Sequence, residues 1–354
     1  MAVGGTAGLE SGPVKTLKKV LLIVVSVLVA VIAIGLPSVV GLRPFIGAKK
    51  RPLTARTFER TPARLERGKY LLTSGHPPCA LCHSPMDTSG GGMKVKDGMW
   101  MAGRNWEPDG VPFVTAPNLT PDPETGVGTW TDDQLARAIR EGIGHDGRTL
   151  FPIMPYEKFR NMTDEDLASI VVYLRSLPPV RNPLPPSKVP FPVKYLINSA
   201  PQPVEAPVTA DLSTPEKRGR YDVEVLAVCA DCHTPMDAQG NRVPNMEFAG
   251  GTLLPFGDRK TVASANITPA VNGIPYYTED LFLETIKTGK VRARQLDEMM
   301  PTHYFRNMTD QDLKDIFAYL KTLKPVDHYV DNSLPPTLCP KCGLLHGGGE
   351  RNKK

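Results

Sequence analysis

Two short runs of this chain place cysteine and histidine at one fixed spacing, Cys79-Ala80-Leu81-Cys82-His83 and Cys229-Ala230-Asp231-Cys232-His233. The pattern Cys-x-x-Cys-His is the attachment signature of c-type haem. Two thiols three positions apart reach the two vinyl groups of one porphyrin and form thioethers, and the next residue then lies under the iron. The spacing therefore predicts two covalently attached haem c groups, the first on Cys79, Cys82 and His83 and the second on Cys229, Cys232 and His233.

Two other chemistries use similar cysteine pairs. A thioredoxin-like redox site needs a strand and a helix within a βαβ pattern, and no continuous β-branched run precedes either motif. A zinc site could draw four thiolates from the two pairs together. That interpretation gives no role to His83 and His233. Haem attachment explains all six residues.

After about residue 60 the sequence consists of an internal repeat of two similar copies. Besides the haem motifs, three runs return in the same order in the second copy. They are Arg67-Gly68-Lys69-Tyr70 with Arg218-Gly219-Arg220-Tyr221, Pro117-Asn118-Leu119-Thr120-Pro121 with Ala265-Asn266-Ile267-Thr268-Pro269, and Phe159-Arg160-Asn161-Met162-Thr163-Asp164 with Phe305-Arg306-Asn307-Met308-Thr309-Asp310. Two copies indicate two similar domains, since a solenoid needs three or more.

A sixth iron ligand decides whether each haem is reactive or built for electron transfer. Met154 and Met300 are matched between the copies, and each precedes a proline after a loop. Ligation by histidine and methionine raises the reduction potential. We therefore expect Met154 and Met300 as the distal ligands of two electron-transfer haems.

Other methionines and histidines are weaker candidates for the distal position. Met86 and Met236 follow the proximal histidines by only three residues, Met162 and Met308 are expected to pack inward, and Met299 has Ile153 as its counterpart. Four histidines have no histidine counterpart in the other copy, and we expect them on the surface or in loops: His76, His145, His303 and His328.

The elements expected to hold these residues are helical. Thr61-Pro62 begins a helix with proline at its first position, and Thr131 with Gln134 forms a capping box. Thr163 caps a helix that carries apolar residues at helical spacing and stops at Pro178. Long alternation typical of strands is absent, so each copy is expected to be helical; the all-α fold itself is what the family resemblance given below implies.

An uncharged stretch from residue 20 to 42 is long enough to span a bilayer as a helix. A cleaved signal peptide is the alternative, although its apolar region is usually shorter. Basic residues are more numerous after the stretch than before it, which by the positive-inside tendency would place the bulk of the chain in the cytoplasm. We set that tendency aside because haem c is attached outside the cytoplasmic membrane in bacteria, as the family resemblance given next implies.

Each copy resembles a class I cytochrome c domain: an early helix with Arg-Gly-x-Tyr, then Cys-x-x-Cys-His, a Met-Pro loop, and a closing helix that ends in Tyr173-Leu174 or Tyr319-Leu320. The whole is similar to the membrane-anchored dihaem cytochromes c of respiratory complexes and periplasmic dehydrogenases. The resemblance implies crossed first and last helices over a buried haem with an exposed edge. It also implies that the backbone carbonyls of Pro85 and Pro235 help fix the proximal imidazoles.

These observations divide the chain into seven parts. They are a cytoplasmic N-terminus (1–19), a membrane anchor (20–42), a basic link (43–59), a first cytochrome c domain (60–180), a proline-rich linker (181–213), a second domain (214–328) and a tail (329–354). The proline-rich segment is expected to hold no helix and to be extended and semi-rigid.

Two segments depart from the family pattern. The first copy has an insert at 87–111 with Trp100 and Trp106, which is expected to cover a haem or to contact a partner. The tail holds Cys339 and Cys342 without a histidine directly after them, so a third haem is rejected. A local disulfide is one interpretation, and a metal site with His346 is another that lacks a fourth ligand.

Three functions remain to be weighed. The first is a membrane-tethered relay that passes electrons between redox protein partners and performs no bond chemistry of its own. The second is a dihaem peroxidase, which needs an open haem that two methionine ligands would deny it. The third is the dedicated cytochrome subunit of an alcohol, aldehyde or sugar dehydrogenase. The net charge of +5 suits steering toward an acidic partner, and no basic stripe with interleaved aromatics indicates nucleic acid.

Overall fold

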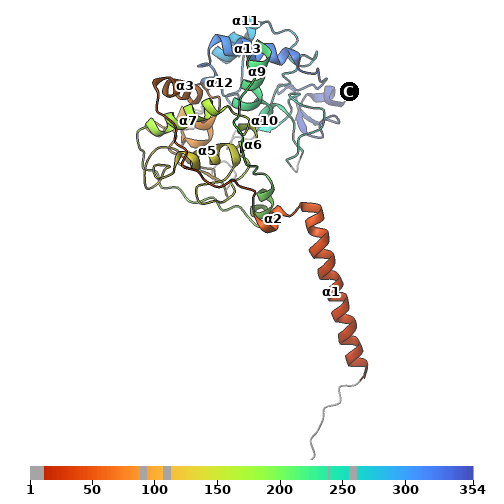
Figure 1. Ribbon diagram of the computed structural model, residues 1–354. Helices are drawn as coiled ribbons and strands as arrows, with labels where there is room; N and C mark the ends of the chain where they lie inside the picture. Colours follow the sequence, from red (N-terminus) through yellow and green to blue (C-terminus); the bar gives the residue numbers. More distant parts are fainter. Residues whose placement is uncertain (1–11, 88–93, 107–112, 238–239, 255–260, 354) are drawn as a thin grey trace, which may run out of the picture.

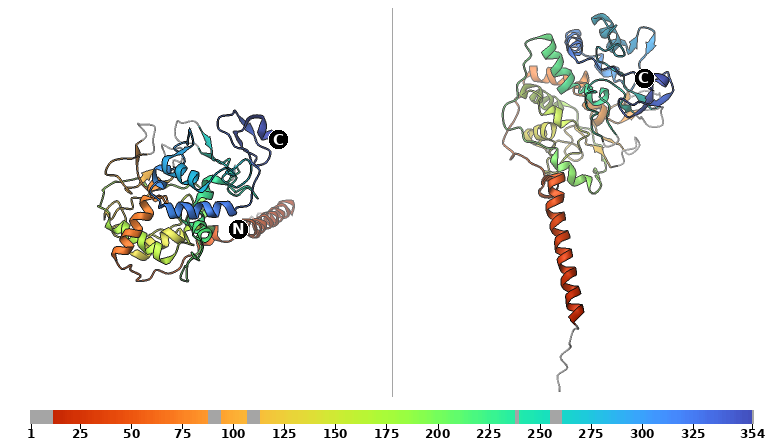
Figure 2. Two further views of the ribbon diagram at one scale, coloured as in Figure 1. Left: turned by 90° about the horizontal axis from the view of Figure 1, so that it is seen from above. Right: turned by 90° about the vertical axis from the view of Figure 1, so that its right-hand side faces the viewer.

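The computed structural model describes residues 12–87, 94–106, 113–237, 240–254 and 261–353. Helix α1 (Gly12–Val40) projects from a folded head as a single stalk (Figures 1 and 2). Within the described residues it is the one helix long and apolar enough to cross a membrane, over Thr16–Val40, and none of its apolar window is buried. The anchor expected at residues 20–42 therefore coincides with one continuous helix. That helix begins eight residues before the expected start and ends two residues before the expected end.

The first half of the head contains α3 (Pro62–Thr73), α4 (Cys79–His83), α5 (Asp132–Glu141), α6 (Tyr156–Phe159) and α7 (Asp164–Ser176). Each long helix begins where a threonine caps it, as the sequence predicts. Thr61 accepts from the Arg64 amide, and Thr131 forms the full capping box with Gln134. Thr163 caps α7.

The second half repeats this order. It contains α9 (Pro215–Tyr221), which continues as a π-helical turn η3 (Asp222–Leu226), then α10 (Cys229–His233), α11 (Glu279–Thr288), α12 (Thr302–Phe305) and α13 (Asp310–Thr322). Thr214, Thr278 and Thr309 cap α9, α11 and α13 through their side chains. The two halves form neighbouring lobes of the head in Figure 1.

Strands in the described residues form only two-stranded antiparallel pairs. The pairs are β1 (Met86–Asp87) with β2 (Lys94–Val95), β3 (Arg104–Asn105) with β4 (Thr115–Ala116), β5 (Leu253–Leu254) with β6 (Val262–Ala263), β7 (Lys290–Val291) with β8 (Arg294–Gln295), and β9 (Pro336–Leu338) with β10 (Leu345–Gly347). They stiffen loops and bury no sheet face. The all-α prediction is confirmed.

Glycine in the repeated Arg-Gly-x-Tyr run allows the first and last helices of each half to cross. Helix α3 packs on α7, and α9 packs on α13. A Cβ on Gly68 would lie 2.0 Å from the Ser169 carbonyl oxygen, and one on Gly219 would lie 1.8 Å from that of Asp315. No side chain fits at that distance, so the crossing requires glycine at both positions.

Tyrosine in the same run joins the two halves. The Tyr221 hydroxyl accepts from the Thr163 amide (3.0 Å) and donates to the Asp166 carboxylate (2.8 Å), at the start of α7 in the other half. The Tyr70 hydroxyl reciprocally accepts from the Thr309 amide (2.8 Å) at the start of α13 and donates to a carboxylate in the first turn of that helix. The repeat thus produces a pseudo-symmetric interface in which each half holds the last helix of the other.

A buried carboxyl group lies beside this interface. Burial raises the pKa of Asp222 well above its ordinary value, and the negative charge of Asp312 adds to the rise. Arg67 opposes it, while Asp166 and Asp315 reinforce it. Asp222 therefore gains a proton more readily in the folded protein than in the unfolded chain.

The proline-rich segment departs from the expectation in one place. Residues 193–199, which contain no proline, form α8 (Val193–Leu196) and a 3₁₀ turn, η2 (Ile197–Ser199). The prediction that no helix forms was therefore wrong here, because the prolines that exclude a helix stand on either side of this run. Both elements contact α2 (Arg43–Ile46) at the foot of the stalk.

Candidate haem sites

Both Cys-x-x-Cys-His runs form a single short helical turn, α4 or α10, directly after the first long helix of each half. The Nδ1 atom of His83 lies 2.8 Å from the Pro117 carbonyl oxygen, and that of His233 lies 2.7 Å from the Ala265 carbonyl oxygen. Such a bond fixes the tautomer and turns Nε2 into the nitrogen available to a metal. The two proximal histidines are therefore held in the same way.

The carbonyl acceptor is not the one that the family resemblance implied. The Pro85 carbonyl accepts from the Lys96 amide, and the Pro235 carbonyl accepts from the Val243 amide. The expectation for Pro85 and Pro235 was wrong because each proline leads into an antiparallel pairing, which takes its carbonyl oxygen. The acceptors lie in the repeated Pro-Asn-Leu-Thr-Pro and Ala-Asn-Ile-Thr-Pro runs, and that repetition is the signal that could have indicated them.

The same run explains how this carbonyl is positioned. The Asn118 side chain accepts from the amide and hydroxyl of Thr120 and donates to the Val180 carbonyl. Asn266 repeats these bonds with Thr268 and Val326 in the second half. The Asn-x-Thr pair therefore fastens the loop that supports each proximal imidazole to the chain that follows the last helix.

The cysteines of the motifs are not tuned as redox thiols. Burial raises the pKa of both Cys79 and Cys229 to about 12. A thioredoxin-like nucleophile needs the opposite shift, since only the thiolate attacks a disulfide. The surroundings of these cysteines thus argue against the redox-site interpretation.

The two motifs lie near each other where the halves meet, because Val228, directly before the second motif, packs in the same hydrophobic cluster as Ala80 of the first. Burial raises the pKa of Cys82 to about 11, with Arg104 opposing the rise and Cys232 of the other motif adding to it. The ring of Tyr304 from α12 lies 6.1 Å from that of Trp100 and packs into the core of the first half. Trp100 thereby connects the first-half insert with the second half, while much of that insert lies outside the described residues.

The candidate distal methionines occupy equivalent positions. Met154 and Met300 are half-buried, each directly before the Pro that caps α6 or α12, and each packs against the core of its own half. Met162 and Met308 are fully buried core residues, as expected. Met154 and Met300 are therefore the matched pair of methionines that is only half-buried in both copies.

The unmatched histidines are not all at the surface. His76 is buried against Ser74 and the ring of Tyr70, and His328 is completely buried, but both lie in loops, as expected. The expectation was wrong for His303, which is half-buried on a helix. His145 stacks on Trp130. His303 lies on α12 near Met300, and its Nε2 atom is buried without a hydrogen-bond partner in the described part of the chain. It is the histidine that could compete for the second iron.

The interior of the head also lacks acceptors for buried donors. Besides His303, Trp106 Nε1 and the Tyr304 hydroxyl are buried without a partner among the described residues. A porphyrin carries propionate groups that accept such hydrogen bonds. Together with the first Cys-x-x-Cys-His turn, the unpaired Trp106 and Tyr304 donors fit a haem against the core of the first half.

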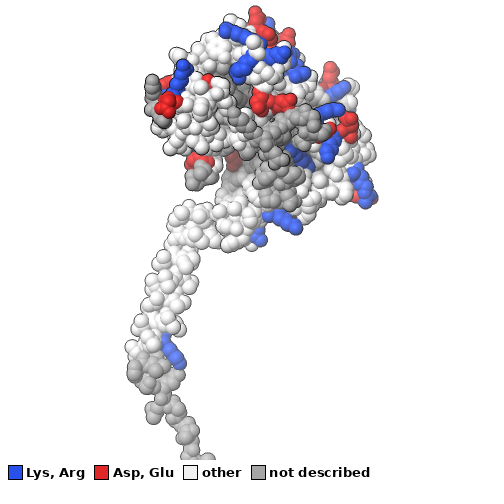
Figure 3. Space-filling model, turned by 180° about the vertical axis from the view of Figure 1, so that it is seen from behind, with Lys and Arg blue, Asp and Glu red and all other residues white. Residues whose placement is uncertain are grey.

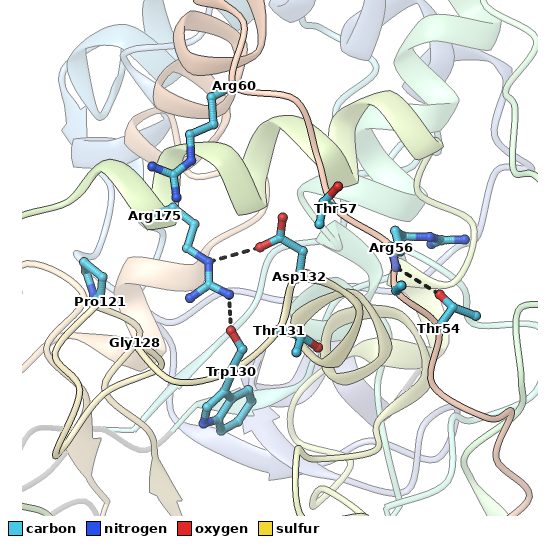
Figure 4. Close-up of a pocket in the computed structure, with 11 residues that line it drawn as sticks. Thr54, Arg56, Thr57, Arg60, Pro121, Gly128, Trp130, Thr131, Asp132 and Arg175 are labelled. Atoms are coloured by element: carbon cyan, nitrogen blue, oxygen red, sulfur yellow. Dashed lines mark hydrogen bonds and ion pairs between the residues drawn. The ribbon is translucent and has the colours of Figure 1, made fainter.

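A surface hollow of about 480 Å³ lies elsewhere, where the basic link crosses the first half (Figure 4). Arg175 projects into it and donates to the Asp132 carboxylate (3.1 Å) and to the Trp130 carbonyl. None of the haem-motif residues lines this hollow. It is therefore not the site of either haem.

Two such turns with carbonyl-held histidines, each under crossed helices, define a protein with two c-type haem sites. The comparisons agree. The cytochrome c family model matches residues 65–178 and 224–324, which together exceed half of the chain. The chain belongs to the cytochrome c family.

Three relatives illustrate the likeness. A dihaem cytochrome c-type protein of Cereibacter sphaeroides is 31% identical over 74% of this chain and 86% of its own length. The fructose dehydrogenase cytochrome subunit of Gluconobacter japonicus is 31% identical over 76% of this chain. The alcohol dehydrogenase (quinone) cytochrome c subunit of Gluconacetobacter polyoxogenes is 29% identical over 77%. The chain spans only 55% and 58% of the last two relatives.

Family and fold together establish the kind of protein. The chain has the two haem c sites of a dihaem cytochrome c, a class of protein whose haems transfer electrons. The recognition of a dihaem cytochrome c from the sequence is confirmed.

Proposed function

We propose that this chain is the membrane-tethered cytochrome subunit of a periplasmic dehydrogenase and relays electrons through its two haems. The observation that carries the proposal is a hydrophobic cluster that both halves share, in which Ala80 of the first attachment motif packs together with Val228, the residue directly before the second motif. A shared cluster supports two haems in one continuous protein interior. The chain then connects a donor at one haem with an acceptor at the other.

In this proposal the first haem is bound through Cys79 and Cys82 with His83 and Met154 as axial ligands, and the second through Cys229 and Cys232 with His233 and Met300. A thioether opposite an imidazole raises the reduction potential and closes the iron to small ligands. A closed iron suits a relay and excludes a peroxidase. The domain boundaries given above, 60–180 and 214–328, belong to the same proposal.

The axial ligands are tested by carbon monoxide. Met154→Ala and Met300→Ala should each open one reduced haem to carbon monoxide and lower its potential. Met86→Leu, at a matched methionine close to the proximal histidine, is the control and should leave both haems closed. Stoichiometric binding by the unaltered protein would contradict the proposal. A His303→Ala variant that opens the second haem while Met300 is still present would show that histidine ligates the second iron.

Membrane attachment follows from the stalk. Its apolar window is unburied, and Figure 3 shows acidic and basic side chains interspersed over the head while the stalk is almost free of them. We infer a single-pass anchor in the bacterial cytoplasmic membrane with the haem domains on the periplasmic side. External protease should digest the head in spheroplasts; protection of the head until lysis would contradict this orientation.

The donor is proposed from the relatives, which are named as subunits of fructose, alcohol and gluconate dehydrogenases. A catalytic subunit that oxidises an alcohol, aldehyde or sugar should co-purify with the tagged chain from detergent-solubilised membranes. Its substrate should then reduce both haems. Reduction by quinol alone, with no dehydrogenase present, would instead indicate a carrier of the respiratory chain.

A further inference from the structure

Four potential metal ligands converge in the tail, away from both haem motifs. They are His328, Cys339, Cys342 and His346, and one ligand atom of each lies within 4.8 Å of all the others. All four side chains are buried, with exposed fractions of 0%, 2%, 6% and 1%. The sequence indicated three of them, and the structure adds His328, which follows α13 by several residues.

Local structure explains how the residues meet. The chain turns between β9 and β10, and Cys339 and Cys342 lie in this turn while His346 lies on β10. Gly343 closes the turn with φ +74° and donates its amide to the Cys339 carbonyl (2.8 Å). Glycine at position 251 leaves room for the His328 ring, because a Cβ atom there would lie 2.7 Å from the His328 Cε1 atom.

Both histidines present the same nitrogen to the centre of the cluster. The His328 Nδ1 atom bonds to the Ala249 carbonyl and the His346 Nδ1 atom to the Gly347 carbonyl, each at 2.9 Å. A carbonyl can only accept, so both Nδ1 atoms carry the proton and both Nε2 atoms carry a lone pair. These two Nε2 atoms face each other at 3.1 Å. Two lone pairs at that separation repel unless a cation lies between them.

The distances suit one tetrahedral ion. The Cys339 Sγ atom lies 3.4 Å from the His328 Nε2 atom. Bonds of about 2.0–2.1 Å to nitrogen and 2.3 Å to sulfur place tetrahedral ligand atoms about 3.3–3.8 Å apart. A two-iron cluster would hold cysteines and histidines on different irons and so farther apart. The cluster has room for a single ion.

The internal repeat supplies a natural comparison. Asn182 follows the last helix of the first half, in the position that His328 holds in the second. Its side-chain amide donates to the Ala102 carbonyl (2.8 Å), the counterpart of the Ala249 carbonyl. An amide therefore suffices to make this bond. Histidine at position 328 adds a second nitrogen, directed at the two cysteines.

We propose that His328, Cys339, Cys342 and His346 bind one zinc ion as a closed, four-coordinate structural site. Both thiols lose their protons on binding, and the two histidines bind neutral through Nε2. No ligand position stays open for water or substrate. The site is independent of the proposed electron relay.

The site fastens the tail to the loop behind the second haem. Ala249 is followed by Gly250, whose amide donates to the His233 carbonyl (2.7 Å). The His328 carbonyl accepts from Asn266, the neighbour of Ala265, whose carbonyl holds the His233 imidazole. Zinc thus stabilises both chain segments that flank the proximal histidine of the second half.

Metal content of the full-length holoprotein tests the proposal. Cells are grown with zinc, copper and iron all supplied, and elemental analysis should find one zinc for every two irons. Zinc-edge X-ray absorption should show two sulfur and two nitrogen ligands. His328→Asn, which copies Asn182 and can keep the bond to Ala249, should reduce zinc at least tenfold while both haems stay attached. Leu345→Ala, directly before His346 but with an exposed apolar side chain, should retain zinc.

Three results would overturn the proposal. One is a Cys339–Cys342 disulfide, seen by mass spectrometry as a tail peptide two mass units lighter. Another is a third iron or a copper ion in place of zinc. The last is H328N protein with full zinc content. The first two need no variant, so the test holds even if H328N fails to fold.

Discussion

Replacing Tyr221 with phenylalanine tests how the two haem-bearing halves are held together. The variant loses the hydroxyl that accepts from the Thr163 amide and donates to the Asp166 carboxylate. A hydrogen bond to a charged group contributes about 1.5–3 kcal/mol and a neutral one about 0.5–1.5 kcal/mol. Asp166 keeps its ion pair with Arg67 at 2.8 Å, so it does not become an unpaired buried charge.

The expected loss in the free energy of unfolding is therefore near the lower end of the two ranges taken together, about 2 kcal/mol. If the head unfolds as one unit, each kcal/mol shifts its melting temperature by about 2–4 °C, so a fall of about 4–8 °C is expected. Tyr70→Phe should behave alike, since its hydroxyl makes the reciprocal contacts with α13. The assay is thermal unfolding of the holoprotein, followed by calorimetry and by haem absorbance.

Tyr156→Phe is the matched control. Its hydroxyl makes one 3.3 Å bond to the Leu150 carbonyl within the first half. It should lower stability by about 1 kcal/mol at most and should not separate the halves. The double variant Y70F/Y221F should instead unfold in two steps and slow electron exchange between the haems. Melting of both single variants within 1 °C of the unaltered protein, with one transition in the double variant, would refute this reasoning.

Two further perturbations test the packing. Gly219→Ala should lower the free energy of unfolding by about 1–2 kcal/mol, because overpacking against the Asp315 carbonyl outweighs the helix propensity of alanine. Arg220→Ala on the exposed face of the same helix is the control. An equal loss of stability in both variants would contradict the argument that the helix crossing requires glycine. Asp222→Asn should raise the melting temperature at pH 7. The raised pKa of this carboxyl means that the folded protein loses stability as the pH rises above the ordinary pKa of aspartate. The gain in melting temperature should therefore vanish near pH 4, and a gain independent of pH would show another cause.

The sequence predicted those features that depend on nearby residues. The caps Thr61, Thr131 and Thr163 begin helices where expected because a cap acts only on the next turn. The haem motifs were recognisable because five adjacent residues hold the whole attachment chemistry. The burial of Met162 and Met308 was expected for the same local reason, since each adjoins a helix cap.

Features that depend on distant segments could not be predicted. The carbonyls of Pro117 and Ala265 reach the histidines across more than thirty residues, and although they begin a repeated run, the repeat does not say which residue that run contacts. The exchange of tyrosines between halves needs the relative placement of two domains. His328 could not be assigned to the cysteines of the tail, because α13 and its following loop decide where it lies.

The central claim, two haems each held between histidine and methionine, is tested most directly by near-infrared magnetic circular dichroism of the oxidised holoprotein. The charge-transfer band of ferric haem has a different energy for imidazole–thioether, bis-imidazole and five-coordinate iron. We predict imidazole–thioether bands that account for both haems of each chain. A high-spin band from one haem, or a bis-imidazole band in place of a thioether band, would contradict the account.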